Sequence, residues 1–444
     1  MRRQFRTWWG FVVLATVTLA SSCGHSGASR RDDARIATKL EQAGGMRADP
    51  VRERVYVADR TAQRLLVVDP ATGGVIQSAA LPGVPAGIAT DEAGDRLFVA
   101  LTDRLSVVTL DAVTLAVTRE TKLLSQPRNL EWIRVDTVLA ATTAGLVEVD
   151  VATGSTRSVG PAVAATALLA ADVERSLVFA AQPDANGIAI YRFDLSSPIG
   201  GNASVVLPQP GPPTGLTLSF DRHRLMVGAR QDASLLILNA QTLALIDRVP
   251  SASTGPLAMA CNRVSTRLYV APGGPVADGI ELERFATFQT LVAPDAIRAM
   301  GMVVDPFSAH LLVHLDDDTL RSVPLFNARL QGPLVAVPGA DFSVEIRGEP
   351  DEGFVLYAGV QPGVTYLDPP GSPAPRFLDL DLAVAMPLAS GVLDGLGHRD
   401  IVFTVDPAAT DGTVLLQSVL LGTPGSGLRA VSNPFAVKVV TGSE

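Results

Sequence analysis

Cysteine, lysine and clustered positive charge are scarce in this sequence of 444 residues. Its two cysteines are Cys23 and Cys261, and its lysines are confined to Lys39, Lys122 and Lys438. The formal net charge is −9. Nucleic-acid binding is therefore disfavoured, because neutralising phosphates requires clustered basic residues.

Long apolar runs with a helical period are also missing. Val, Leu, Ile and Thr occupy short runs that are separated by many of the 39 glycines and 31 prolines. Short apolar runs punctuated by turn residues are typical of all-β proteins. Because 47% of the residues are hydrophobic and 18% are charged, we expect most of the chain to fold rather than remain disordered.

Motifs for common catalytic chemistry are absent. The sequence has no Gly-x-Ser-x-Gly elbow, Walker loop, Gly-x-Gly-x-x-Gly string or Cys-x-x-Cys pair. Cys261 lies in the apolar stretch "LAMACNR", far from any histidine, so we interpret it as a buried small side chain. We therefore predict no catalytic residue, no cofactor and no metal ion.

The first 22 residues predict a signal peptide, with a basic start, an apolar run from Trp8 to Ala20 and small residues after it. The end of this segment, "LASSC", resembles the lipobox of bacterial lipoproteins, although its leucine stands one place early. The resemblance implies lipid attachment at Cys23. The alternative is ordinary cleavage near Ala20 or Ser22, which would release a soluble exported protein.

Residues 23–43 predict a flexible, lipid-anchored tether, because "GHSGASRRDDA" is small and polar. Gly24 follows the cysteine instead of the aspartate that retains lipoproteins at the inner membrane of enteric bacteria. The resemblance therefore implies a position at the outer membrane or cell surface. We expect membrane attachment through the lipid only.

A sequence repeat of about forty residues runs through residues 44–339. The marker residue within each repeat's apolar run is listed here: Tyr56, Phe98, Leu139, Phe179, Met226, Tyr269 and Leu312. An Asp or Asn stands seven residues before most markers, and "VVDPAT", "TLDAVT" or a similar string follows a second apolar run. These side chains can close turns by bonding backbone N–H groups two residues on.

Nearly continuous apolar runs predict strands whose sheets are covered on both faces. A repeat of about 40 residues with four short strands is typical of one blade of a β-propeller. The repeat pattern therefore predicts seven blades, approximately at 44–85, 86–127, 128–166, 167–214, 215–256, 257–298 and 299–339. Two segments compete to complete the last blade, 34–40 and 327–337.

The stretch "PAGIATDEAGDRLFVAL", with the Asp-x-x-Thr that follows it, resembles the YVTN and lactonase-like family of seven-bladed propellers. The likeness is good in repeats one, two, five and six and weak in three and seven. It implies the fold, and it says little about function.

The repeat is absent from residues 340–444, but short strand-like apolar runs continue there. This pattern predicts a small β-sandwich. The stretches "VFTVDPAATDGTVLLQSVLL" and "LRAVSNPFAVKV" resemble a module at the end of exported proteins of planctomycetes and related bacteria. That module, too, places a strand with glutamine before a Ser-Asn turn and a final strand. An eighth blade with a tail is the alternative, although the spacing does not support it.

Departures from the repeat are the best candidates for a binding site. Repeat four is lengthened by "QPDANG" and by residues 196–215, and repeat six carries "PGGPVADGI". Because loops on a rigid scaffold often carry binding, we select Asn186, Asn202, Gln209 and Asp278 as candidate binding-loop residues. The alternative is that these loops are tolerated insertions.

His310 and His314 flank the strand-like "HLLVH". On an extended strand they would lie about 13 Å apart, too far to share one metal ion. The acidic run at 316–318 is expected to be a solvated turn, although its carboxylates could also suit calcium.

Two functions remain open. The first is a non-catalytic, exported binding or scaffold protein that recognises an envelope protein or a glycan. The second, supported by the fold resemblance alone, is a lactonase-like hydrolase that uses the propeller channel. Subunits of redox or export machines are further alternatives. Three or more ionisable groups converging on the channel would favour an enzyme, whereas an Ala- and Gly-lined channel would favour a binding protein.

Overall fold

The computed structural model of the chain is all-β, and its described residues contain no helix. The description covers residues 36–40, 43–159, 163–196, 202–209, 211–219, 221–229, 231, 234–250, 258–261, 267–271, 276–281, 286–292, 299–305, 310–326, 329–333, 335–360, 362–367, 377–421 and 428–441. Side chains of residues 36–39 and 276–292 and of a few other residues are not described.

Seven four-stranded antiparallel sheets occupy the described residues up to Pro324. The strands of the first three sheets are β2 (Ala43–Ala48), β3 (Val55–Asp59), β4 (Arg64–Val68), β5 (Val75–Ala80); β6 (Pro85–Thr90), β7 (Arg96–Leu101), β8 (Ser106–Asp111), β9 (Val117–Lys122); β10 (Pro127–Arg134), β11 (Thr137–Thr142), β12 (Gly145–Asp150) and β13 (Thr156–Val159).

The fourth to seventh sheets continue this order. Their strands are β14 (Leu168–Asp172), β15 (Leu177–Asp184), β16 (Gly187–Asp194), β17 (Ala203–Leu207); β18 (Pro213–Leu218), β19 (Arg224–Ala229), β20 (Ser234–Asn239), β21 (Leu245–Pro250); β22 (Ala258–Cys261), β23 (Arg267–Ala271), β24 (Val276–Glu281), β25 (Ala286–Val292); β26 (Ala299–Val304), β27 (His310–Leu315), β28 (Thr319–Pro324) and β1 (Ile36–Lys39).

The burial of each strand follows its place in the sheet. The second and third strands, such as β7 and β8, are buried along nearly their whole length, whereas the outer strand β9 is largely exposed. Apolar side chains from neighbouring sheets form shared cores; Tyr56, Leu65, Leu97 and Leu110 lie in one of them. This explains the continuous apolar runs, since both faces of each middle strand are covered.

The sheets form a closed ring. The first strand of each sheet lies against the first strand of the next, and β26 of the seventh sheet lies against β2 of the first. The seventh sheet has the order β1-β28-β27-β26, so Ile36–Lys39 supplies its outer strand. The first of the two closing segments considered above is therefore the one used, and it lies within residues that were expected to form a tether.

The C-terminal region forms a three-stranded sheet (β29-β31-β36), a larger sheet ordered β30-β39-β37-β32-β35 with β38 on β37, and the hairpin β33-β34. Their bounds are β29 (Arg329–Gln331), β30 (Val335–Ala336), β31 (Asp341–Arg347), β32 (Gly353–Gly359), β33 (Pro362–Tyr366), β34 (Phe377–Leu380), β35 (Met386–Val392), β36 (His398–Thr404), β37 (Gly412–Leu421), β38 (Leu428–Val431) and β39 (Phe435–Val439).

One apolar core joins the two larger C-terminal sheets. It contains Val344 and Ile346 of β31, Phe354 and Leu356 of β32, and Phe435 of β39, all of them buried. Strands β29 and β30 precede the boundary expected at residue 339, yet they pair with β31 and β39 beyond it. The C-terminal domain therefore begins structurally before Gly339.

Candidate functional site

The ring of sheets has two faces. Because consecutive strands are antiparallel, the turns between the first and second strands, and between the third and fourth, lie on one face. The turns between the second and third strands, and the connections between sheets, lie on the other. We call the first the domain face and the second the far face.

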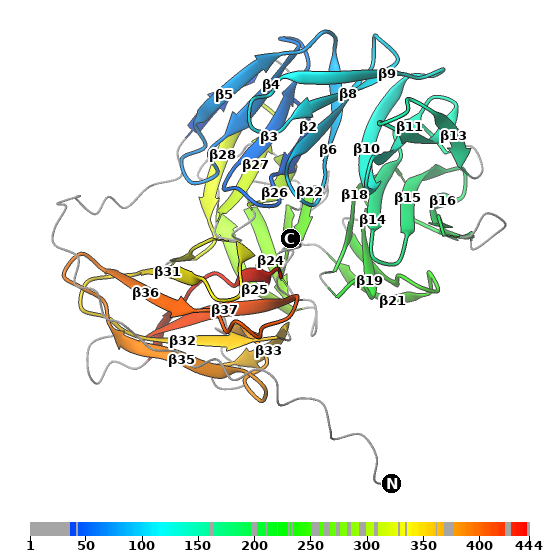
Figure 1. Ribbon diagram of the computed structural model, residues 1–444. Helices are drawn as coiled ribbons and strands as arrows, with labels where there is room; N and C mark the ends of the chain where they lie inside the picture. The colour runs from blue at the N-terminus through cyan, green and yellow to red at the C-terminus, as the bar shows by residue number, and fades with distance from the viewer. Residues whose placement is uncertain are drawn as a thin grey trace.

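The domain face carries the contacts with the C-terminal domain. Arg267 Nη2 lies 2.8 Å from Asp379 Oδ2, Arg329 pairs with Glu53, and Lys438 Nζ lies 3.5 Å from Glu92 Oε1. Figure 1 shows the C-terminal strands, coloured yellow to red, gathered on one side of the ring. The far face therefore points away from the C-terminal domain.

The Arg267–Asp379 pair is the most buried of these contacts, with side-chain exposures of 6% and 0%. Arg267 Nε also lies 3.0 Å from both carboxylate oxygens, and its guanidinium stacks on Phe326. Burial alone would lower the pKa of Arg267, but the Asp379 carboxylate raises it above its ordinary value. The arginine thus stays charged inside the interface.

Gln417 extends this pair into the C-terminal domain. Its side chain accepts a hydrogen bond from Asp379 N at 2.7 Å and donates to Asp379 Oδ2 at 3.1 Å and Ser432 O at 3.0 Å. Asn433 in turn bonds both backbone groups of Leu330 at the start of the domain. Gln417 and the Ser432-Asn433 pair belong to the two stretches that the sequence marked as resembling an exported-protein module.

Arg267 and Arg96 hold the same place in their repeats but have different carboxylate partners. Arg96 holds the same place in the second sheet, where it bonds its own repeat's Asp91 at 3.1 Å and also Asp136 of the next sheet. In the sixth repeat the aspartate is replaced by an asparagine at position 262, which lies outside the described residues.

Two of the predicted binding residues lie together on the far face. Asn186 is exposed in the turn between β15 and β16, and Gln209 lies in the connection after β17. A Cβ at Gly187 would lie 1.9 Å from Leu207 O and 2.9 Å from Gln209 N, so the turn packs directly on that connection. Gln209 itself is 7% exposed.

The other predicted residues lie elsewhere. Asn202 is exposed at the opposite end of the fourth sheet, just before β17. Asp278, expected in a loop, lies within β24, where it pairs with Val270 and Thr290; the glycine-rich stretch predicted a turn, and strand pairing extends into it. Cys23 lies outside the described residues.

An exposed leucine on the far face escaped sequence analysis. Leu124, in the connection between β9 and β10, is 98% exposed, and Leu105 in the neighbouring turn is 39% exposed. Leu123 N donates a hydrogen bond to Leu105 O, which holds the two segments together. The repeat keeps its usual length here, so no insertion marked the site; only the exposure of an apolar side chain does.

The inner strands bring backbone into close contact near the axis of the ring. A Cβ at Gly45 would lie 2.9 Å from Ala86 O, and one at Gly87 would lie 2.7 Å from Arg128 O. A bidentate ion pair joins Arg47 of β2 to Glu131 of β10, at 2.6 and 3.1 Å, past the intervening β6. The Arg47 guanidinium and the Glu131 carboxylate therefore neutralise each other's charge.

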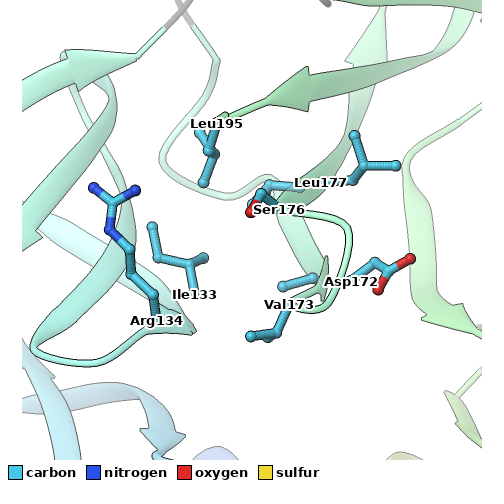
Figure 2. A pocket seen from close by; sticks show the side chains of 9 residues that line it. Ile133, Arg134, Asp172, Val173, Ser176, Leu177 and Leu195 are labelled. Atoms are coloured by element: carbon cyan, nitrogen blue, oxygen red, sulfur yellow. The ribbon is translucent and has the colours of Figure 1, made fainter. Parts of the chain in front are cut away.

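The pocket in Figure 2 lies between the third and fourth sheets, at the domain face. Its volume is about 10 Å³, room for about one water molecule. Arg134 and Asp172 at its edge form ion pairs with Glu148 and with Arg175 and Arg222. This pocket is therefore too small for a substrate.

The recurrent aspartates act as turn residues, as predicted. Asp49 Oδ1 accepts hydrogen bonds from Val51 N and Arg52 N, both at 2.9 Å, and its other oxygen accepts the Tyr56 hydroxyl at 2.6 Å. Burial and the Asp49 hydrogen bond raise the pKa of Tyr56. Asp69 likewise accepts from Ala71 N at 2.9 Å.

The two histidines of β27 contact different carboxylates. His310 Nδ1 lies 3.0 Å from Asp305 Oδ2, and His314 Nε2 lies 3.3 Å from Asp318 Oδ1. Burial lowers the pKa of His314. Asp317 Oδ1 accepts hydrogen bonds from Thr319, as expected of a turn residue.

Comparison with solved structures decides the architecture of the ring. A chain of Kuenenia stuttgartiensis hydrazine synthase superposes with a TM-score of 0.53 at 12% identity, covering 67% of this chain and 99% of that one. The β-propeller domain of Myceliophteria thermophila Cps50 (Swd1) gives a TM-score of 0.53 at 14% identity, covering 65% of this chain and 99% of that one. The ring is a β-propeller.

At these identities the likeness concerns the fold alone. No protein-family model matches the sequence of the propeller or of the C-terminal domain, and no curated protein matches it. Within the residues described, no helix is long and apolar enough to cross a membrane.

Proposed function

We propose that the chain is a non-catalytic binding or scaffold protein whose propeller presents its far face to an envelope protein or a glycan. The observation that carries this proposal is the division of the two faces. The C-terminal domain contacts the domain face through a buried ion pair, whereas the far face exposes the side chains of Asn186 and Leu124 and holds Gln209 buried. A rigid support with one face turned outward suits recognition.

We also propose a more detailed architecture and a cellular location. The propeller has seven blades of the YVTN type, and the C-terminal domain is a β-sandwich like those of planctomycete-type exported proteins. The chain is exported, and Cys23 carries a lipid that holds it at the outer membrane or cell surface. Cys23→Ala should leave the fold unchanged and move the protein from the membrane fraction to the soluble fraction.

The far face is tested by a pull-down from native envelope with residues 24–444. Leu124→Asp adds a charge to the far face, and Val135→Asp adds one to an equally apolar site on the domain face, where Val135 is 72% exposed. We expect the first variant to lose a partner that the second retains. Both should fold, because surface changes of this kind alter stability little. Equal retention by both variants would show that another surface binds.

The alternative is a lactonase-like hydrolase. Arg47 and Glu131 near the axis are the ionisable groups that favour it, although each already has the other as partner. Hydrolysis of a lactone panel by the wild type, lost in Glu131→Gln, would support the enzyme over the binding protein.

A further inference from the structure

The seam between the seventh and first sheets holds three side chains of metal-ligand type. Glu53, Asp305 and His310 each place one ligand atom within 4.8 Å of the others. Asp305 has a side chain that is 0% exposed, while those of His310 and Glu53 are 13% and 22% exposed. They come from the turn between β2 and β3 and from the equivalent turn of the seventh sheet.

The repeat shows what normally occupies this place. Asp91, Arg96 and Asp136 hold the same repeat positions at the seam between the second and third sheets. There the Arg96 guanidinium bonds both carboxylates, one from its own sheet and one from the next. At the seventh seam the arginine position is His310, which replaces a permanent cation with a side chain that can ligate a metal ion.

We propose that Glu53, Asp305 and His310 bind a zinc ion, which supplies the positive charge that Arg96 supplies at the other seam. One imidazole nitrogen and two carboxylate oxygens form a donor set that suits Zn²⁺. Bonds of about 2.0–2.1 Å in a tetrahedral site place ligand atoms roughly 3.3 Å apart. The 3.0 Å between His310 Nδ1 and Asp305 Oδ2 needs only a small opening to accept the ion.

Arg329 supports this site from outside. It donates a hydrogen bond to Glu53 Oε1. Hydrogen bonds to a ligating carboxylate are common around metal sites and fix its orientation. Because Arg329 belongs to β29 of the C-terminal domain, the site joins the two ends of the ring and lies next to the domain contact.

The test uses residues 24–444 stripped with a chelator and titrated with zinc sulfate by calorimetry. We expect the wild type to bind one zinc ion and to melt at a higher temperature with zinc than without. His310→Arg rebuilds the arrangement of the second seam, so it should fold and lose zinc binding. Glu53→Gln should weaken binding at least tenfold. Asp95→Asn, at the position of Glu53 in the next repeat, should bind like the wild type.

Two outcomes would overturn the proposal. The first is that the wild type takes up no zinc at micromolar concentrations, which would mean that the three side chains hold no metal ion. The second is that His310→Arg binds zinc as tightly as the wild type, which would place the ion elsewhere on the chain. The melting temperature of each variant is also measured without zinc. A variant that melts cooperatively near the wild-type temperature is folded, so its loss of zinc binding is not due to misfolding.

Discussion

The propeller and the C-terminal domain satisfy their buried charges in different ways. In the propeller, Asp49 bonds backbone and side chains within its own turn, and Arg96 reaches only to the next sheet. In the C-terminal domain, Asp379 depends on Gln417 and on Arg267 of another domain. Asp49 and Arg96 thus find partners in their own sheet or the next one, whereas Asp379 is paired with Gln417, 38 residues away, and with Arg267, 112 residues away. The Arg47–Glu131 pair of the propeller, 84 residues apart, is the intermediate case.

The strongest test of this contrast removes equivalent arginines from the two settings. Arg267→Ala leaves Asp379 buried without its cation, which should cost about 3–5 kcal/mol of unfolding free energy. Arg96→Ala removes a partly exposed guanidinium and should cost at most about 1 kcal/mol. Urea denaturation of both variants gives the comparison, and equal losses would contradict it.

Removing both partners sharpens the same test. The double variant Arg267→Met with Asp379→Leu should recover most of the stability lost by Arg267→Ala, because no uncompensated charge remains buried. Calorimetry should then show whether the two domains, which we expect to unfold together in the wild type, unfold separately without the ion pair.

A second test compares packing. A Cβ at Gly87 would meet backbone of the next sheet at 2.7–2.8 Å, whereas one at Gly395 in the C-terminal domain has nothing within 4 Å. Gly87→Ala should therefore destabilise the protein by roughly 1–3 kcal/mol, and Gly395→Ala should change it by less than about 0.5 kcal/mol. A neutral Gly87→Ala would mean that the inner strands can move apart.

The smallest expected effect concerns pH. Hydrogen bonds from Arg104, Lys122 and Ser106 lower the pKa of Glu120 from 4.5 to about 2. A lowered pKa means that this carboxylate stabilises the fold above pH 4.5, and that the contribution is lost as the pH falls toward 2. The carboxylate is partly exposed, so the effect should stay below about 1 kcal/mol. Glu120→Gln should flatten that part of the stability curve.

The features that can be predicted from the sequence are those that local chemistry controls. The turn role of Asp49 and the four strands per repeat follow from residues a few places apart. The choice between the two closing segments stayed open, because pairing between Ile36 and Arg321 joins opposite ends of the ring and leaves no local pattern in the sequence. The neighbouring glycines and proline led us to expect Asp278 in a loop. It lies in a strand because pairing with β23 overrides that local signal.

The candidate sites were less predictable. Asn186 and Gln209 were selected because they break the repeat, and they do lie close together. Leu124 and the Arg267–Asp379 pair break no spacing rule that can be read along the chain. Exposure and partners across more than a hundred residues are properties of the folded molecule, so only the three-dimensional arrangement identifies them.

The pairing of β1 with β28 also has a consequence in time. Ile36 is made early, and its partner Arg321 follows only after nearly all of the ring. At synthesis rates of ~5–20 residues per second, the first strand waits on the order of tens of seconds without a partner. Once β28 has formed, the equivalent first strand of a second molecule can pair with it instead. We therefore expect refolding at high concentration to yield strand-exchanged dimers, which dilution before refolding would avoid.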